Sequence, residues 1–217
     1  MGLNLGVLAS GSGSNLQAII DAVSGGRLPV SLRAVISDNP DAFALKRAEK
    51  AGIQTRVVTP APGAPREAHD EKVVAALKEM GADAVTLAGY MLMVTPVLLK
   101  AFPGRVVNIH PALLPAFPGL HVQAAALMHG VKFSGCTVHF VDEGMDTGPI
   151  IIQAVVPVRD DDTEETLAAR ILREEHRIYP QALKYLAEGR LKVTDGRVTV
   201  DPPEPGSGTL HNPPVSF

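Results

Sequence analysis

The sequence predicts an α/β fold in which helices cover both faces of one mostly parallel, twisted β-sheet. Two observations lead to this prediction. Short apolar runs rich in Val, Ile and Leu alternate with segments of helical periodicity along most of the chain. A glycine-rich loop, residues 10–15, joins the first apolar run to the first helical segment. Parallel strands joined by helices form a three-layer, Rossmann-like architecture.

The expected elements follow one another in chain order. Pro65 is expected to open the third helix, because proline suits the first helical position. The two earlier helices are expected over residues 15–23 and 43–51. Strands are expected over residues 3–9, 32–36, 55–58, 84–88, 105–109, 137–141 and 150–158.

The C-terminal quarter of the chain predicts a long helix followed by a β-hairpin. Asp162 and Glu165 have the spacing of a helix cap and an acid three positions later, so a helix is expected from there to about Glu188. Residues 191–200 alternate around Asp-Gly, which predicts a C-terminal β-hairpin with a tight turn. Residues 201–217 are rich in Pro, Gly and Ser and are expected to form a disordered tail.

Composition limits the possible classes of function. The net charge of −3 predicts no nucleic-acid partner, since such partners select basic surfaces. One cysteine, Cys136, excludes a disulfide or a cysteine-based zinc site within the chain. The sequence shows neither a signal peptide nor an apolar run long enough to span a bilayer. We therefore expect a cytoplasmic protein without a membrane partner.

The loop of residues 10–15 reads Ser-Gly-Ser-Gly-Ser-Asn and stands between a strand and a helix. Free amides at the start of a helix attract phosphate groups. The loop lacks the Lys of a Walker motif, and Leu16 stands where a dinucleotide fingerprint has its third glycine. Two interpretations stay open: a phosphate site, or a tight turn with a Ser or Asn cap.

Asn108 and His110 point to the same face at the end of an apolar strand. Burying them costs free energy unless they are paired with each other or used. A histidine can donate a proton near neutral pH, and an asparagine amide can stabilise an oxyanion. Asp146 follows the next strand, and in an open sheet we expect it beside His110, where it would favour the protonated imidazole. If this acidic loop is taken alone, a solvated turn is the alternative.

No pair of histidines has the spacing of a metal site, so no metal is expected. His69, His129 and His211 are interpreted as surface residues. His121 and His139 are close enough in sequence to the candidate site to support it.

Three further positions have two interpretations or a special conformation. Glu175 lies on the apolar row of the long helix and is either half exposed or directed at a ligand. Arg66 opposes the dipole at the start of a helix, and it is either solvated or paired with an anion. The Leu114–Pro115 bond is a candidate for the cis conformation.

Seven short segments together resemble the glycinamide ribonucleotide formyltransferase family in order and spacing. They are residues 8–17 (LASGSGSNLQ), 87–91 (LAGYM), 108–115 (NIHPALLP), 118–121 (PGLH), 137–141 (TVHFV), 146–150 (DTGPI) and 175–180 (EHRIYP). The resemblance implies one formyltransferase domain over residues 1–200. Its phosphate-binding half would span about 1–100, and its folate-binding and catalytic half about 101–200.

The resemblance also implies a reaction and its residues. The amine of glycinamide ribonucleotide (GAR) would take the formyl group of the co-substrate 10-formyltetrahydrofolate, without a metal. Asn108 and protonated His110 would stabilise the oxyanion, while Asp146 would keep His110 charged and help to move the proton. The residues implied to bind GAR are Gly13, Ser14, Asn15 and Glu175. Those implied to bind folate are Arg66, Met91, Leu92, Met93, Val94, Asn108, Val141 and Met145, with His121, Thr137 and His139 supporting the site from behind.

One position departs from the family pattern: Leu92 stands where a basic residue is usual, so a contact to the folate glutamate tail would be missing. The expected partners are small molecules, and the chain is expected to be a monomer or a weak homodimer. Two alternatives stay open. Another formyl-group enzyme, a hydrolase or an amino-sugar transferase, would leave the glycine loop unexplained. A non-catalytic nucleotide-binding module would leave Asn108, His110 and Asp146 unexplained.

Overall fold

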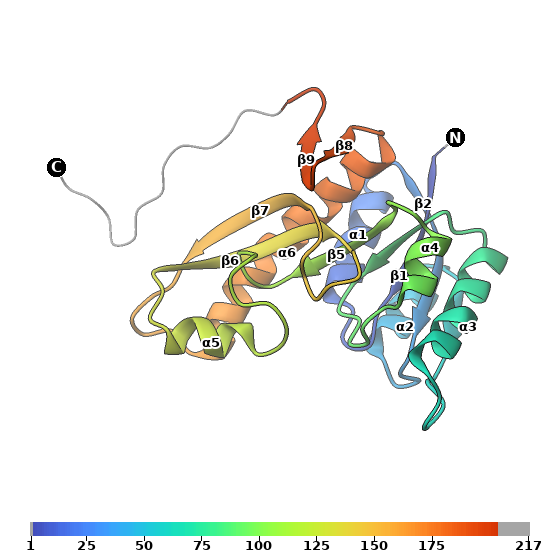
Figure 1. Ribbon diagram of the computed structural model, residues 1–217, viewed down its shortest axis with the longest axis horizontal. Coiled ribbons are helices and arrows are strands. Elements are labelled where there is room, and N and C mark those ends of the chain that lie inside the picture. Colours follow the sequence, from blue (N-terminus) through green and yellow to red (C-terminus); the bar gives the residue numbers. More distant parts are fainter. Residues whose placement is uncertain (1, 204–217) are drawn as a thin grey trace.

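A seven-stranded β-sheet forms the centre of the protein in a computed structural model that describes residues 2–203 (Figure 1). The spatial order of the strands is β3-β2-β1-β4-β5-β6-β7. Strands β1 to β5 pair in parallel, whereas β6 runs antiparallel to both β5 and β7. The prediction of a mostly parallel sheet is therefore confirmed. The strands are β1 (Leu3–Leu8), β2 (Val30–Ser37), β3 (Thr55–Val57), β4 (Ala84–Leu87), β5 (Val106–His110), β6 (Phe133–Phe140) and β7 (Ile150–Pro157).

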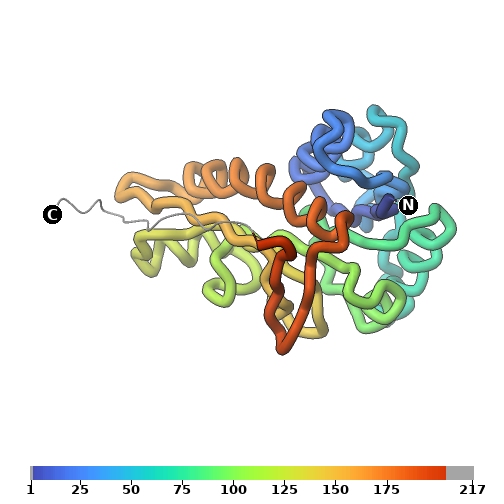
Figure 2. The backbone as a smooth tube through the Cα atoms, turned by 90° about the horizontal axis from the view of Figure 1, so that it is seen from above, coloured from blue at the N-terminus to red at the C-terminus, as the bar shows by residue number. Residues whose placement is uncertain are grey.

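Helices cover both faces of this sheet, which confirms the three-layer arrangement. Apolar residues of α1 (Ser14–Ser24), α2 (Phe43–Lys50) and α6 (Glu164–Ala187) join one buried cluster with the sheet. Those of α3 (Arg66–Glu79) and α4 (Pro96–Ala101) join a second cluster. The long helix α6 extends along β6 and β7, and α5 (Val122–Met128) lies near its first turns (Figure 2).

The C-terminal hairpin is also as predicted, with β8 (Leu191–Thr194) antiparallel to β9 (Arg197–Val200). The disordered tail stays a prediction, but its first residues make contacts: the Asp201 amide donates to the Arg190 carbonyl at 2.9 Å, the Asp201 carboxylate pairs with Lys192 at 2.5 Å, and the Pro202 carbonyl accepts from Arg190 at 2.8 Å. Residues 204–217, including His211, lie outside the described residues. Among residues 2–203, no helix has the length and apolar character needed to cross a membrane.

Two helix starts differ from the sequence prediction, and two helices were not predicted. Pro65 caps α3 from outside the helix. Thr163, not Asp162, caps α6 in a reciprocal capping box with Thr166, because the Asp162 carboxylate is occupied by Arg170 at 2.6 Å. Helix α4, which was not predicted, begins after Thr95, whose hydroxyl accepts from the Val97 amide at 3.3 Å. Helix α5 was not predicted either.

Tyr179 of α6 ties this helix to the sheet beneath it. Its side chain is fully buried, and its hydroxyl lies 2.7 Å from the Leu87 carbonyl at the end of β4. The same hydroxyl accepts a hydrogen bond from Thr86. Because buried polar groups are costly when unpaired, this network fixes α6 relative to the strand end.

Cys136 lies in the core on β6. It is fully buried and belongs to one apolar cluster with Val156, Leu167 and Ile171. Burial raises the pKa of the thiol to about 12. Since the thiolate is the reactive form of cysteine, this side chain contributes packing rather than nucleophilic chemistry.

Candidate active site

A cavity of about 520 Å³ lies where β1, β4 and β5 end. Strand order reverses between β1 and β4, and ligands of open α/β sheets bind at such switch points. Most of the residues singled out in the sequence line this cavity: Asn15, Met91, Leu92, Met93, Val94, Asn108, His110, His121, His139, Val141, Met145, Asp146 and Glu175. Gly13, Ser14, Arg66 and Thr137 do not line it.

His110, at the end of β5, has an oxygen acceptor beside each ring nitrogen. Its Nδ1 lies 3.4 Å from Oδ2 of Asp146, and its Nε2 lies 2.8 Å from the carbonyl oxygen of Phe117. The imidazole is 4% exposed. Each ring nitrogen can therefore donate to a nearby oxygen when it carries a proton.

The backbone bends sharply at both residues that present these acceptors. Asp146 has φ 55° and Phe117 has φ 53°, in the left-handed region that side chains other than glycine rarely adopt. The Asp146 carboxylate is held further by the Gly119 amide, at 2.9 Å from Oδ2. Such conformations cost free energy and cluster at functional sites. Here they direct two acceptors at one imidazole.

Asp146 meets His110 by a route that the sequence did not predict. The expectation assumed that the strands end at one edge of the sheet, but β6 is antiparallel to β5, and Phe140 pairs with Val107. The segment after β6 therefore starts beside the amino end of β5, where the Val141 amide donates to the Val106 carbonyl at 2.9 Å. It then runs along β5 to bring Asp146 to His110.

Asn108 is oriented by His139 and not by His110. Nδ2 of Asn108 lies 3.3 Å from Nε2 of His139, while Nδ1 of His139 lies 2.8 Å from the Phe140 carbonyl. Burial lowers the pKa of His139, so a neutral ring donates from Nδ1 and accepts at Nε2. The structure therefore shows no hydrogen-bonded pair of Asn108 and His110. One N–H of the Asn108 amide is left for a ligand.

Thr137 supports the loop after His110 from behind the cavity. Its hydroxyl accepts from the Leu114 amide at 3.0 Å and donates to the Ala112 carbonyl at 2.7 Å. Sequence reasoning missed Gln153 of β7, which donates to the Leu114 carbonyl at 2.9 Å. A polar residue within an apolar strand was the available signal. The Leu114–Pro115 bond is cis, as predicted.

His121 and His139 were expected behind the site, but both line the cavity. His121 reaches it because its backbone adopts φ 56° just before α5. His139 reaches it because it pairs with Asn108 on the same face of the sheet.

Glu175 and Asn15 form a buried polar pair at the cavity wall. Nδ2 of Asn15 donates to Oε2 of Glu175 at 2.7 Å, and the two residues are 8% and 6% exposed. Burial raises the pKa of Glu175. Oδ1 of Asn15 has no partner in the described residues. Of the two interpretations of Glu175, the half-exposed side chain was wrong, because Glu175 is buried and lines the cavity.

The glycine loop presents bare amides at the start of α1. Gly13 has φ 68°, and a Cβ built on it would lie 2.7 Å from Cα of Ala44, so this position requires glycine. No side chain caps α1, which excludes the tight turn with a Ser or Asn cap. The amides of Ser14 and Asn15 have no acceptor among residues 2–203.

A second cavity of about 260 Å³ shares Met91, Leu92 and Met93 with the first. Arg66 lines it, from the exposed start of α3. His69 lines it too, and the expectation that His69 lies on the surface was wrong: it is 6% exposed, and its Nε2 lies 2.8 Å from the Tyr90 hydroxyl. His129 is exposed, as predicted.

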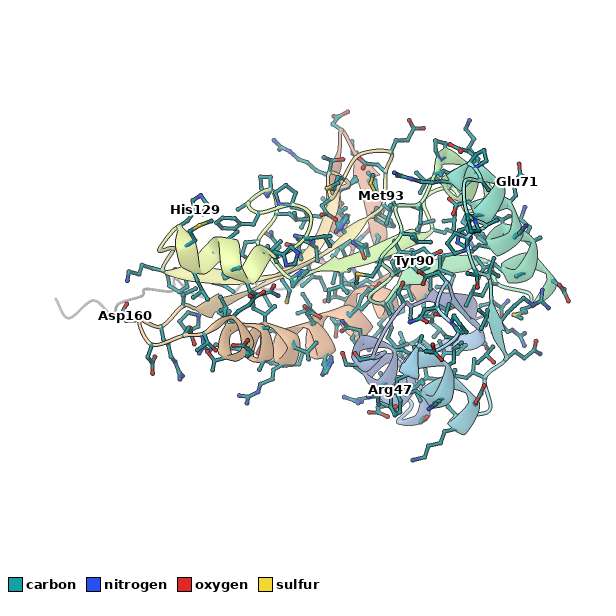
Figure 3. The ribbon with its side chains drawn as sticks, turned by 90° about the horizontal axis from the view of Figure 1, so that it is seen from below. Arg47, Glu71, Tyr90, Met93, His129 and Asp160 are labelled. Atoms are coloured by element: carbon teal, nitrogen blue, oxygen red, sulfur yellow. The ribbon has the colours of Figure 1, made fainter. Side chains whose placement is uncertain are left out.

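Exposed apolar side chains surround the main cavity. Met91, Met93, Leu120 and Met145 are 65%, 44%, 76% and 50% exposed, although large apolar side chains usually avoid water. Figure 3 shows Met93 and Tyr90 near the middle of the molecule, between its two ends. An apolar wall beside a few convergent polar groups is typical of a site for a flat, drug-sized ligand.

The arrangement thus combines an acid–base pair, an amide donor, bare helix-start amides and an apolar wall. Residues 3–183 match the family model described as Formyl transferase. The chain belongs to the formyl transferase family.

Individual relatives narrow the class further. The chain is 42% identical over 199 residues to phosphoribosylglycinamide formyltransferase of Escherichia coli K12, covering 92% of this chain and 94% of that one. The structure of glycinamide ribonucleotide transformylase 1 from Symbiobacterium toebii is similar with a TM-score of 0.90 at 53% identity, over 92% and 94% of the two chains. A formyltetrahydrofolate deformylase from Pseudomonas syringae has a TM-score of 0.86 but 28% identity, over 92% and 66%.

Proposed function

We propose that this protein transfers the formyl group of 10-formyltetrahydrofolate to the amine of GAR, a step of purine biosynthesis. The observation that supports it most is the meeting of Asn108, His110 and Asp146 at one cavity, in a chain similar to GAR formyltransferases over nearly its whole length. No group of three or more metal-ligating side chains was found among residues 2–203.

The chemistry follows from the positions of these groups. The amine lone pair of GAR attacks the formyl carbon, and the formyl oxygen becomes an oxyanion. The free N–H of Asn108 and the Nδ1–H of protonated His110 donate to this oxygen; Nδ1 is 3.4 Å from Asp146 without a hydrogen bond, whereas Nε2–H stays with the Phe117 carbonyl. The bond from the carbon to folate N10 then breaks, and the proton lost by the amine ends on N10. Asp146 keeps His110 charged and accepts the proton in transit.

The two substrates would occupy different walls. The GAR phosphate would accept hydrogen bonds from the amides of Gly13, Ser14 and Asn15, and Glu175 would accept from the ribose hydroxyls. The pterin would lie against the apolar wall formed with Met145 and Val141 and against the backbone of residues 91–94.

Arg66 faces the second cavity, which adjoins this wall, so we assign it to the tail of the folate. The second cavity also receives the side chain of Leu92, which offers no charge to that tail. His69 and Asp70 line the same cavity.

We further propose that residues 1–200 form one domain whose two halves have different roles. About the first 100 residues hold the phosphate, and residues 101–200 hold the folate and the catalytic groups. A monomer or a weak homodimer stays a prediction. A cytoplasmic location stays a prediction.

Hydrolysis of the same formyl donor is the second candidate, supported by the likeness to the deformylase. The bare amides of the glycine loop favour the ribonucleotide amine, because water as an acceptor has no phosphate to bind. The test is consumption of 10-formyltetrahydrofolate with GAR, with glycinamide, with an amino sugar nucleotide, and with no acceptor. We expect formyl-GAR as the product and strong dependence on GAR. Equal consumption without GAR, with release of formate, would overturn the proposal.

A further inference from the structure

We infer that Arg47 of α2 is a positioning residue for the substrate phosphate, acting through the glycine loop. This inference rests on the proposed function, since it names the group that prepares the phosphate site of that reaction. Arg47 does not line the main cavity. Its role is therefore argued from the contacts that it makes with the loop.

Arg47 connects the loop to α1. Its Nε donates to the Ser12 carbonyl at 2.8 Å, and its Nη1 donates to Oε1 of Gln17 at 3.1 Å. Gln17 in turn donates to Oδ1 of Asp21 at 2.8 Å. One guanidinium thus fixes the loop relative to the first turn of the helix that follows it.

A second contact from α2 holds the neighbouring peptide. The Ala44 amide donates to the Gly11 carbonyl at 3.1 Å, and Gly13 packs directly on Ala44. Two consecutive carbonyls of the loop, those of Gly11 and Ser12, are therefore held by α2. Because the C=O and N–H of a trans peptide point in opposite directions, the following N–H groups are turned away from α2, toward the space at the start of α1.

The charge of Arg47 is also available at this position. Among residues 2–203, no carboxylate forms an ion pair with it, and the Phe43 ring covers its guanidinium at 4.8 Å from the centroid. Figure 3 shows Arg47 beside α1 and α2. Arg47 is half-buried and has no carboxylate partner in the described part of the chain, so its positive charge stays beside the loop that carries the bare amides.

Helix α6 carries a buried ring nitrogen without a partner in residues 2–203. Nε2 of His176, the residue after Glu175, is buried and has no partner among the described residues. Burial lowers the pKa of His176, and the charge of Arg47 lowers it further, while Asp21 opposes this shift. A charge on α2 and a charge on α1 thus both act on the His176 ring of α6.

The test compares Arg47→Gln and Arg47→Lys with Lys50→Gln, which removes the same charge from an exposed position of the same helix. For each full-length variant, KM for GAR, KM for 10-formyltetrahydrofolate, kcat and the inhibition constant of ribose 5-phosphate would be measured. Arg47→Gln is expected to raise KM for GAR and the inhibition constant of ribose 5-phosphate about tenfold, with kcat and the folate KM unchanged. Lys50→Gln is expected to match the parent.

Arg47→Lys separates the contribution of the charge from that of the guanidinium hydrogen bonds, since lysine keeps the charge but lacks the planar guanidinium. We expect it to recover only part of the GAR affinity. A normal KM for GAR in Arg47→Gln, or equal losses for GAR and folate, would overturn the inference. If Arg47→Gln melts early, the same comparison in Arg47→Lys decides. A parent protein that transfers no formyl group to GAR would instead refute the proposed function.

Discussion

The glycine loop and the end of β5 serve one cavity in opposite ways. The loop offers backbone amides, is held by main-chain hydrogen bonds together with Arg47 and Asn39, and requires glycine at Gly13. The end of β5 offers side chains, Asn108 and His110, and each is oriented by a residue from another element. We thus assign phosphate binding to the rigid backbone of the glycine loop. We assign the chemistry to the side chains at the end of β5, of which His110 can gain or lose a proton.

The difference between the glycine loop and the end of β5 has a physical reason. A phosphate is recognised by fixed dipoles, which need no proton transfer and work at any pH in the neutral range. Formyl transfer needs a group that can donate a proton, and the environment of that group sets its charge. Substitutions in the two regions should therefore differ in which kinetic constant they change.

The largest effect is expected at the end of β5. His110→Ala and Asp146→Asn should each lower kcat by about 10²–10⁴-fold, because each removes proton donation or the charge that supports it. KM for GAR should change little. Steady-state kinetics together with circular dichroism check this. Near-normal turnover in either folded variant would contradict the assigned roles.

Substitutions in the glycine loop are expected to have a smaller effect, on KM for GAR rather than on kcat. Gly13→Ala places a methyl group 2.7 Å from Ala44 at a positive φ, which should cost about 1–3 kcal/mol of stability and raise KM for GAR. Gly11→Ala is the matched control, since its Cβ would meet nothing within 4 Å. Thermal unfolding and KM for GAR measure the difference. Equal melting temperatures and equal KM for GAR in the two variants would show that the loop does not require glycine at Gly13.

Glu175→Gln is expected to have the smallest effect of these substitutions, and this effect should depend on pH. Burial raises the folded-state pKa of Glu175, so the parent loses stability as pH rises through that pKa, whereas glutamine does not titrate. The stability of the variant relative to the parent should therefore increase as pH rises from 4.5, the ordinary pKa of glutamate, through the raised pKa of Glu175. KM for GAR should increase at the same time. Thermal melts at several pH values test this, and a pH-independent difference would refute it.

Long periodic segments were predictable from the sequence, and short or irregular ones were not. The strands, α1, α2, α6 and the hairpin follow from apolar patterning. Helices α4 and α5 have six and seven residues, too few for a periodic pattern. The sequence Thr95-Pro96 did carry a signal for α4, because threonine caps helices and proline suits their first position.

The candidate site was predictable as a set of residues but not as a geometry. Asn108, His110 and Asp146 stand out because polar groups are rare at the end of apolar strands. The antiparallel direction of β6, the carbonyl of Phe117 beside His110 and the burial of His69 depend on tertiary contacts. Local sequence contains no information on such contacts, which explains why these features were missed.

The burial of Cys136 has a practical consequence for observing the site at work. Because its thiol is protonated and enclosed at neutral pH, thiol reagents should leave the native chain unlabelled. Leu120→Cys would then place the one reactive thiol of the protein on the loop beside His121, at a position that is 76% exposed at the rim of the cavity. A fluorophore attached there would report directly on ligand arrival, with no cysteine to remove first.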